Sequence, residues 1–241
     1  MLVFVHGFLG SHLQWSELVK NLKQDYRLLF IDLPGHGAHK KNTTEYQISD
    51  ISKSIHHIIL EHHIEKAHFI GHSMGGYIAS SYSTLFPSFT ASLTLINSIA
   101  GPDSEQRKIE RERSILLIKK LKRAFVSMAI TNLFTITERL EYTDIIEHMK
   151  SQGHDLTQQT IIHAILAMRN RHGSFSQLKS CSFPVLYIYS PDDAIVPETG
   201  VHKEAQLLNC QAVPLDAGHM SILTHPAAIA SILEEKLGAI L

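Results

Sequence analysis

The sequence predicts an α/β protein with a doubly wound, mainly parallel sheet of about six strands and a helical cap insertion. Two observations lead to this prediction. Short apolar runs rich in β-branched residues alternate with helix-like segments, and one stretch, residues 101–180, interrupts the alternation. Continuous apolar runs are typical of parallel strands, because such strands are buried on both faces of their sheet.

The expected strands and helices follow from this alternation. We expect strands at residues 2–5, 27–31, 67–70, 92–97, 185–190 and 210–213. We expect helices at about residues 14–24, 47–63, 74–86, 200–208 and 226–238. Residues 1–100 and 181–241 together therefore form the predicted core.

The interruption carries helical periodicity and no strand pattern. Apolar residues at three-and-four spacing predict one amphipathic helix, on Ile109, Leu116, Leu117, Leu121, Phe125 and Met128. Residues 156–168 repeat the pattern. A helical insertion between two strands of an open sheet lies over the carboxyl ends of the strands, where ligands bind. Residues 101–180 are therefore predicted to be a cap subdomain over the active site.

Composition excludes several classes of protein. The chain has 241 residues, 44% of them hydrophobic, and a formal net charge of −1, which argues against nucleic acid as a partner. It has no apolar run long enough for a membrane helix and no secretion signal, so we expect a cytoplasmic protein. No cofactor is expected. His57 and Glu61 have the spacing of metal ligands, but no third ligand is near in sequence, and no metal site is predicted.

The segment Gly-His-Ser-Met-Gly at residues 71–75 carries the chemistry. It follows an expected strand and precedes an expected helix, with Ser73 at its centre. A turn this sharp strains its central residue and leaves no space for flanking side chains, which explains Gly71 and Gly75. Ser73 is therefore the predicted nucleophile. The alternative is a glycine-rich loop in which Ser73 only caps the helix.

A serine nucleophile needs a base and an acid, which are expected on loops after later strands. Asp192 and Asp193 follow the strand at 185–190, and chain order alone does not say which of them orients the base. His219 follows the last strand, after the flexible Gly218, and is the predicted base. His72 is an alternative base because it neighbours Ser73, but successive side chains on a sharp turn diverge, so we expect His72 to pack under the turn or to line the pocket.

Backbone N–H groups are expected to bind the oxyanion. One comes from Met74, directly after the nucleophile, and the other from the loop after the first strand, where we favour Phe8. The alternative for this loop is an ordinary β-turn at His6 and Gly7.

Five motifs in order resemble the α/β-hydrolase superfamily over nearly the whole chain. They are His-Gly-Phe-Leu-Gly at 6–10 with Trp15, Asp-Leu-Pro-Gly-His-Gly at 32–37, the turn at Ser73, Asp-Ala-Ile-Val-Pro at 193–197, and Gly218-His219. The resemblance implies that Asp193 is the acid and that Asp32 shapes a loop. Relatives usually carry an antiparallel hairpin before the first strand, whereas this sequence starts at that strand, so we expect either a shorter sheet or a truncated start. In both cases residues 27–31 are expected to form an edge strand.

The first two motifs are also similar to the menaquinone-pathway lyase family, the SHCHC synthases, and to pimeloyl-ACP methyl ester esterases. The lyase pattern has Tyr before the nucleophile and Arg four residues after it, to hold a carboxylate-rich substrate. His72 and Tyr77 occupy these positions here. Losing a carboxylate clamp is not a conservative change, so the lyase remains an alternative rather than the leading prediction.

The leading prediction is a serine hydrolase that cleaves a carboxylic ester through a Ser73–His219–Asp193 triad and an acyl-enzyme. The expected substrate contacts are His72, Leu9, Phe125, Met128 and Phe134. Residues 105–123 carry eight basic and three acidic side chains, which fit either a solvated face or a landing site for an acidic acyl carrier. A hydrolase of acyl-carrier or CoA thioesters and a non-catalytic binding module remain alternatives.

Overall fold

The computed structural model describes residues 1–39 and 44–238. Its centre is a six-stranded sheet in the order β2-β1-β3-β4-β5-β6, and every pairing in it is parallel. The strands are β1 (Leu2–Val5), β2 (Leu28–Ile31), β3 (Ala67–His72), β4 (Thr90–Ile96), β5 (Val185–Tyr189) and β6 (Gln211–Pro214). The predicted fold class is confirmed, and each strand overlaps its predicted range.

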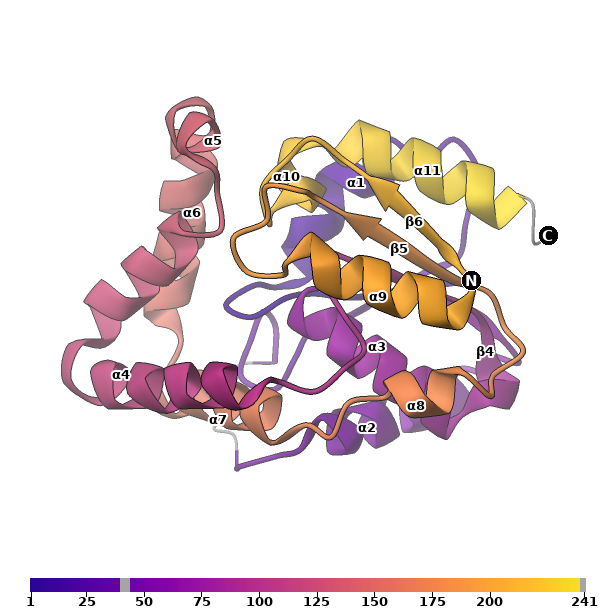
Figure 1. Ribbon diagram of the computed structural model, residues 1–241, viewed down its shortest axis with the longest axis horizontal. Helices are drawn as coiled ribbons and strands as arrows, with labels where there is room; N and C mark the ends of the chain where they lie inside the picture. Colours follow the sequence, from indigo (N-terminus) through magenta and orange to yellow (C-terminus); the bar gives the residue numbers. More distant parts are fainter. Residues whose placement is uncertain (40–43, 239–241) are drawn as a thin grey trace.

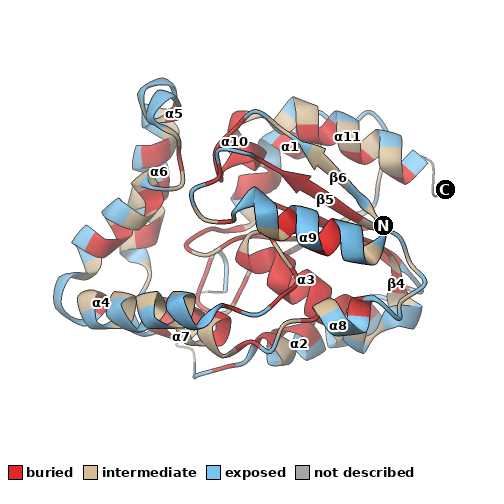
Figure 2. Ribbon diagram, viewed as in Figure 1, coloured by how far each residue is buried: buried red, intermediate tan, exposed pale blue. Residues whose placement is uncertain are grey.

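The centre of the sheet is apolar on both faces. β1 lies between β2 and β3, and its four side chains are fully buried, as its continuous apolar sequence requires. β2 has one neighbour among the described residues and is the expected edge strand, with three of its four residues only half-buried. Figure 2 shows burial concentrated in the strands and in the helix that follows β3.

Helices cover both faces of the sheet (Figure 1). One face carries η1 (His12–Trp15), α1 (Ser16–Lys20), α10 (Ser221–Thr224) and α11 (Pro226–Gly238), which contact one another. The other carries α2 (Ile48–Glu61), α3 (Met74–Leu85) and α9 (Glu198–Leu208), and the short η2 (Pro87–Phe89) leads into β4. α2 begins with a capping box between Gln47 and Asp50, which satisfies amide groups at its first turn.

Every regular element described between β4 and β5 is a helix. This helical insertion (residues 105–178) comprises α4 (Glu105–Thr131), α5 (Ile136–Glu141), α6 (Thr143–Asp155), α7 (Gln158–Asn170) and α8 (Phe175–Leu178). α4 packs against both α6 and α7, whereas α8 contacts α3 in the core. In Figure 1 the helices α4 to α7 extend to one side of the sheet, with α5 at their far end.

The predicted apolar face of α4 is wrong in its details. Ile109, Leu116, Leu121 and Met128 are exposed, and the buried side chains of α4 are Ile118, Phe125, Val126 and Ile130. α4 is kinked at Leu121, whose φ of −140° and ψ of 52° are not helical, so the periodicity does not continue from the first half of the helix to Met128. Before the kink, the buried side chain is that of Ile118, and Ile109 and Leu116 are exposed.

Candidate active site

The turn between β3 and α3 holds Ser73 in a strained conformation. Its φ is 52° and its ψ is −120°, a combination that side chains other than glycine rarely adopt. The neighbouring glycines have no space for a Cβ: one on Gly71 would collide with the carbonyl of Gly75, and one on Gly75 with the carbonyl of Val5. The sequence pattern and the strain have the same origin, which is a chain reversal too tight for side chains.

Three side chains from distant loops form a hydrogen-bonded row. Nε2 of His219 lies 2.8 Å from the Ser73 hydroxyl. Nδ1 of His219 lies 2.7 Å from Oδ2 of Asp193. With the proton on Nδ1 donated to the carboxylate, Nε2 is free to accept the serine proton. The structure thus brings together the three residues predicted as nucleophile, base and acid.

Asp193 is fixed by four donors. Oδ1 accepts from the backbone N–H groups of Ile195, at 2.7 Å, and Val196, at 3.0 Å, and Oδ2 accepts from the side-chain amide of Asn97, at 2.9 Å, besides His219. Burial alone would raise the pKa of this carboxyl, but His219 and the backbone donors hold it below its ordinary value. Asp193 is therefore a carboxylate aimed at His219.

Of the two adjacent aspartates, Asp193 alone contacts both the local backbone and His219. Chain order alone left open which of them orients the base, and a Pro-Asp-Asp segment is also common turn chemistry in which an aspartate bonds the local backbone. Asp193 does both, through different oxygens, and Asp192 is exposed. Because a carboxylate has two oxygens, one side chain can close the turn and face the histidine at once.

His72 holds the histidine loop from the core side. It is buried beneath the turn, and its Nε2–H donates to the carbonyl oxygen of His219 at 2.8 Å. Burial, and next the nearby His219, lower the pKa of His72 to about 3, so the ring is neutral at neutral pH. It also borders the cavity beside Ser73.

The two predicted oxyanion donors lie on either side of Ser73. Met74 is the first residue of α3, so its N–H has no acceptor inside the helix. Phe8 lies in the loop after β1 and borders the cavity, next to Leu9, whose φ of 61° turns the chain sharply. A carbonyl oxygen bound near both N–H groups would meet one donor at the start of α3 and one in the loop after β1.

A cavity of about 210 Å³ opens over Ser73, between the core and the helical insertion. His72, Leu9 and Phe125 line it, as expected for substrate contacts. The structure does not bring Met128 or Phe134 to it: Met128 points outward beyond the kink, and Phe134 is buried in the apolar core. The rest of the wall on the insertion side is mixed: Ala129, Leu133, Ile165 and Met168 are apolar, and Arg107, Glu110, Arg111, Ser114 and Asn132 are polar or charged.

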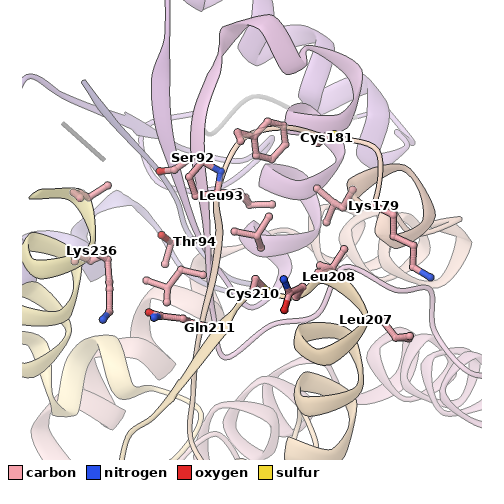
Figure 3. Close-up of a pocket in the computed structure, with 18 of the residues that line it drawn as sticks. Ser92, Leu93, Thr94, Lys179, Cys181, Leu207, Leu208, Cys210, Gln211 and Lys236 are labelled. Carbon is pink, nitrogen blue, oxygen red and sulfur yellow. The ribbon is translucent and has the colours of Figure 1, made fainter. Parts of the chain in front are cut away.

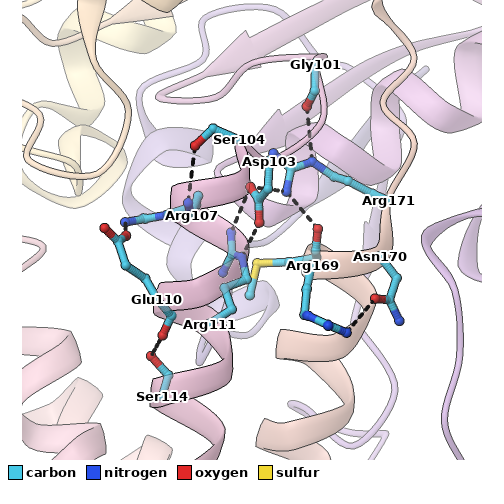
Figure 4. A network of polar contacts seen from close by, with 11 residues as sticks. Gly101, Asp103, Ser104, Arg107, Glu110, Arg111, Ser114, Arg169, Asn170 and Arg171 are labelled. Carbon is cyan, nitrogen blue, oxygen red and sulfur yellow. Dashed lines mark hydrogen bonds and ion pairs between the residues drawn. The ribbon is translucent and has the colours of Figure 1, made fainter.

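Charged side chains of α4 border the same cavity (Figure 4). Arg107 and Glu110 form an ion pair at 3.0 Å, whose charges cancel. Arg111 and Arg171 both bond to Asp103, which is buried, and these two cations hold the pKa of that carboxyl below its ordinary value although burial opposes them. Two guanidinium groups share one carboxylate, so this end of the cavity carries an excess positive charge.

A larger cavity is remote from this chemistry. It measures about 590 Å³ and is lined by residues at the start of β5 and β6 (Figure 3), whereas Ser73 follows the end of β3. Its two thiols, Cys181 and Cys210, are free, and burial raises the pKa of both, that of Cys210 to about 11. A protonated thiol is a poor nucleophile, so these cysteines offer no competing reaction centre.

Two other kinds of site were searched for in the described part of the chain. Within residues 1–39 and 44–238, no three His, Cys, Asp or Glu side chains lie together in a way that suits a metal ion. None of the helices described there has the length and hydropathy needed to cross a lipid bilayer.

Several residues of the site carry no sequence motif. Asn97, with φ of 46° just after β4, donates to Asp193 and also to Ser190. Arg111 was one of many basic residues on α4 with nothing to single it out. Glu138 accepts from the N–H of Gly218, next to His219, and only the capping-box spacing Thr135-x-x-Glu138 could have drawn attention to it.

Comparisons with known proteins agree with this architecture. Residues 1–120 match the family described as "alpha/beta hydrolase fold". An esterase structure from Thermogutta terrifontis superposes with a TM-score of 0.90 at 23% identity, covering 99% of this chain and 89% of that one. The family match and the superposition together show that the chain has the α/β-hydrolase fold.

Three curated relatives give the range of named activities. A dihydrolipoyllysine-residue acetyltransferase component of an acetoin cleaving system from Pseudomonas putida is 30% identical over 91% of this chain, which spans only 58% of that relative. Human monoacylglycerol lipase ABHD6 is 23% identical, over 99% of this chain and 75% of the relative. The 2-succinyl-6-hydroxy-2,4-cyclohexadiene-1-carboxylate synthase of Enterobacter sp. (strain 638) is 25% identical, over 98% and 91%. Family and relatives together support a hydrolase.

Proposed function

We propose that this protein is a serine hydrolase that cleaves a carboxylic ester or a related acyl compound. The observation that supports it best is the hydrogen-bonded row from Ser73 through His219 to Asp193, with distances of 2.8 and 2.7 Å. Both lie within the reach that proton transfer and base orientation require. The strained serine at the start of a helix supports the same proposal.

The proposed reaction has two halves. His219 takes the proton of Ser73 as the hydroxyl oxygen attacks the substrate carbonyl, and Asp193 stabilises the imidazolium that forms. The N–H groups of Phe8 and Met74 bind the oxyanion, and collapse of the tetrahedral intermediate expels the alcohol, which receives the proton from His219. Water, activated by His219, then attacks the acyl-enzyme and releases the acid.

A labelling experiment tests this proposal. A fluorophosphonate probe reacts only with an activated serine, so we expect one label per chain and turnover of a short-chain p-nitrophenyl ester. Ser73→Ala should abolish both while leaving the fold intact. A folded wild-type sample that neither takes the label nor turns over the ester would instead favour a non-catalytic binding module.

The arginine cluster favours a substrate that carries an acidic group. Arg111 borders the cavity, and the excess positive charge it shares with Arg171 over Asp103 would be neutralised by a bound carboxylate. Arg171 also lies 3.7 Å over the ring of Tyr77, the position at which the lyase pattern has an arginine. The guanidinium group of Arg171 therefore places a cation beside this position, although it comes from another part of the chain. The lyase-like alternative remains a second candidate for this reason.

Residues 101–180 are proposed to act as the cap over the site. Their basic outer surface is the second feature that suggests a substrate class: Arg113, Lys119, Lys120 and Arg123 are all exposed on α4. An acidic acyl carrier that presents a thioester to the cavity would meet this surface. A hydrolase of acyl-carrier or CoA thioesters is thus a variant of the same proposal.

A further inference from the structure

The loop that carries His219 is bonded to the helical insertion as well as to the core. The backbone N–H of His219 donates to the carbonyl oxygen of Leu133 at 3.0 Å. The backbone N–H of Gly218 donates to Oε1 of Glu138 at 2.9 Å. Leu133 lies in the turn between α4 and α5, and Glu138 lies in α5, so both acceptors belong to the insertion.

Glu138 is itself held rigidly. Its Oε2 accepts from the N–H of Thr135 at 2.8 Å, and its own N–H donates to the Thr135 hydroxyl at 3.2 Å, which completes a capping box. The side chain is buried, and among the described residues no lysine or arginine forms an ion pair with it. A buried carboxylate that has backbone N–H groups as its partners is fixed in direction by those donors.

The contact is too close for any side chain to intervene. A Cβ built on Gly218 would collide with Oε2 of Glu138, and would lie 3.1 Å from the N–H nitrogen of Thr135 and 3.2 Å from the carbonyl oxygen of Leu133. Gly218 was expected to provide flexibility before the histidine. Its place in the structure gives a different reason for glycine, which is the direct approach of the insertion to the backbone.

The backbone at His219 is therefore hydrogen-bonded to both the core and the insertion. His72, in the core, bonds to the carbonyl oxygen of His219, while the insertion bonds to the N–H groups of His219 and Gly218. The imidazole of the same residue is hydrogen-bonded to Ser73 through Nε2 and to Asp193 through Nδ1. Any movement of the turn 133–138 relative to the sheet would move the histidine backbone with it.

We propose that Glu138 is a positioning residue for the base. Through Gly218, it fixes the backbone from which His219 reaches Ser73, so that docking of the helical insertion and alignment of the base occur together. This inference rests on the proposed hydrolase function, since it assigns His219 the role of base. It concerns the alignment of His219, not a contact of Glu138 with substrate.

The principal test is Glu138→Gln. Glutamine has one acceptor oxygen and one NH₂ donor, so it can accept from Gly218 or from Thr135 but not from both. We expect kcat for a p-nitrophenyl ester, expressed per folded active site, to fall roughly 10- to 100-fold, with KM nearly unchanged. The folded fraction, measured by circular dichroism and thermal unfolding, separates a misaligned base from a loss of folded protein.

Tyr142→Phe is the matched control. The Tyr142 hydroxyl donates to the carbonyl oxygen of Thr224 at 3.2 Å, a second contact between the insertion and the core that does not touch the histidine loop. This variant should keep the wild-type kcat. If Glu138→Gln only lowers the melting temperature and retains kcat per site, or if Tyr142→Phe loses as much kcat, the positioning role is refuted.

Hydrogen exchange tests the same inference without turnover. The amides of Gly218 and His219 should exchange slowly in the wild type, and the Gly218 amide at least tenfold faster in Glu138→Gln. A wild type that fails to hydrolyse any ester would refute the proposed function, and the exchange result would still decide whether Glu138 holds the loop. Equal exchange rates in the two proteins would overturn the inference.

Discussion

The sheet core and the helical insertion contribute to the site in different ways. The core supplies the proposed reacting groups: Ser73, Asp193 and His219 lie on loops that follow β3, β5 and β6. The insertion supplies no member of the row, but contributes Arg111 to the cavity wall and Glu138 to the histidine loop. The difference suggests that chemistry belongs to the core, while substrate choice and alignment depend on where the insertion is docked.

The largest effect on activity is expected from a change in the core, at the proposed acid Asp193. Asp193→Asn keeps the shape of the side chain but removes the acceptor that holds the Nδ1–H of His219. We expect kcat/KM for a p-nitrophenyl ester to fall roughly 10⁴-fold, because the imidazole loses its productive tautomer. Asp192→Asn, one residue away and exposed, should stay close to wild type.

This pair of variants also decides between two arrangements. If Asp192→Asn were the damaging change, the histidine would find its acid elsewhere in solution, and the row of hydrogen bonds would not describe the working enzyme. Equal small effects of the two changes would point to a base that needs no carboxylate.

The core was largely predictable because its elements follow local rules. A parallel strand buried on both faces must be continuously apolar, which located β1, β3 and β5. The turn at Ser73 needs glycines wherever a Cβ would strike a carbonyl, and glycines can be read from the sequence. Since the loops after successive parallel strands meet at one edge, chain order then predicted His219 as the base and left Asp192 and Asp193 as candidates for the acid. The resemblance to the α/β-hydrolases was needed to choose Asp193.

The insertion was less predictable because its contributions depend on tertiary placement. The kink at Leu121 interrupts the periodicity on which the apolar face was predicted, so Met128 was expected at a cavity that it does not reach. Arg111 is one of eight basic residues between positions 105 and 123, and only the fold shows that it borders the cavity. The bond from Gly218 to Glu138 spans 80 positions, with no pattern that links its ends.

The next largest effect is expected in the insertion, at Arg111. Arg111→Gln should reduce kcat/KM for a p-nitrophenyl monoester of a dicarboxylic acid by roughly 10- to 100-fold, since a hydrogen bond to a charged group contributes about 1.5–3 kcal/mol. The neutral p-nitrophenyl ester of equal chain length should be hardly affected. Asp103 keeps Arg171 as its partner, so the variant should fold.

Arg113→Gln is the control for this comparison. It removes the same charge from the same helix, but Arg113 is exposed and is absent from the cavity wall. If both variants lose the same amount of kcat/KM for the acidic ester, the effect comes from the overall positive charge of α4 and not from Arg111 in the cavity wall. If neither does, the cavity does not select an acidic substrate.

A moderate effect on stability should originate in the core. Burial, and then His36 or His219 respectively, lower the pKa of His6 and His72 to about 3, from an ordinary value of 6.5. Between pH 6.5 and about 3 the unfolded chain binds protons at these sites and the folded chain does not, so the free energy of unfolding falls as pH decreases. Each site contributes roughly 1.4 kcal/mol per pH unit.

Urea denaturation at pH 7, 6 and 5 measures this dependence. In the same measurement, His72→Gln should reduce the slope of the free energy of unfolding against pH. The reduction should equal the contribution of one histidine, roughly 1.4 kcal/mol per pH unit below pH 6.5. Asp193, whose pKa is held below its ordinary value of 3.8, adds its own loss of stability only at lower pH. An unchanged slope would mean that His72 is protonated in the folded protein.

The smallest effect is expected on the outer surface of the insertion, where Lys119, Lys120 and Arg123 are exposed. Replacing all three by glutamine should raise KM for a thioester on an acidic acyl carrier roughly three- to tenfold, because each exposed charge pair contributes only about 0.2–1 kcal/mol. Salt should produce the same rise in the wild type, since exposed pairs are screened.

The short neutral ester reaches Ser73 without this surface and should be turned over at the wild-type rate. A parallel loss on both substrates would show that the substitutions disturb α4 itself, and no loss on either would show that the basic face is merely solvated.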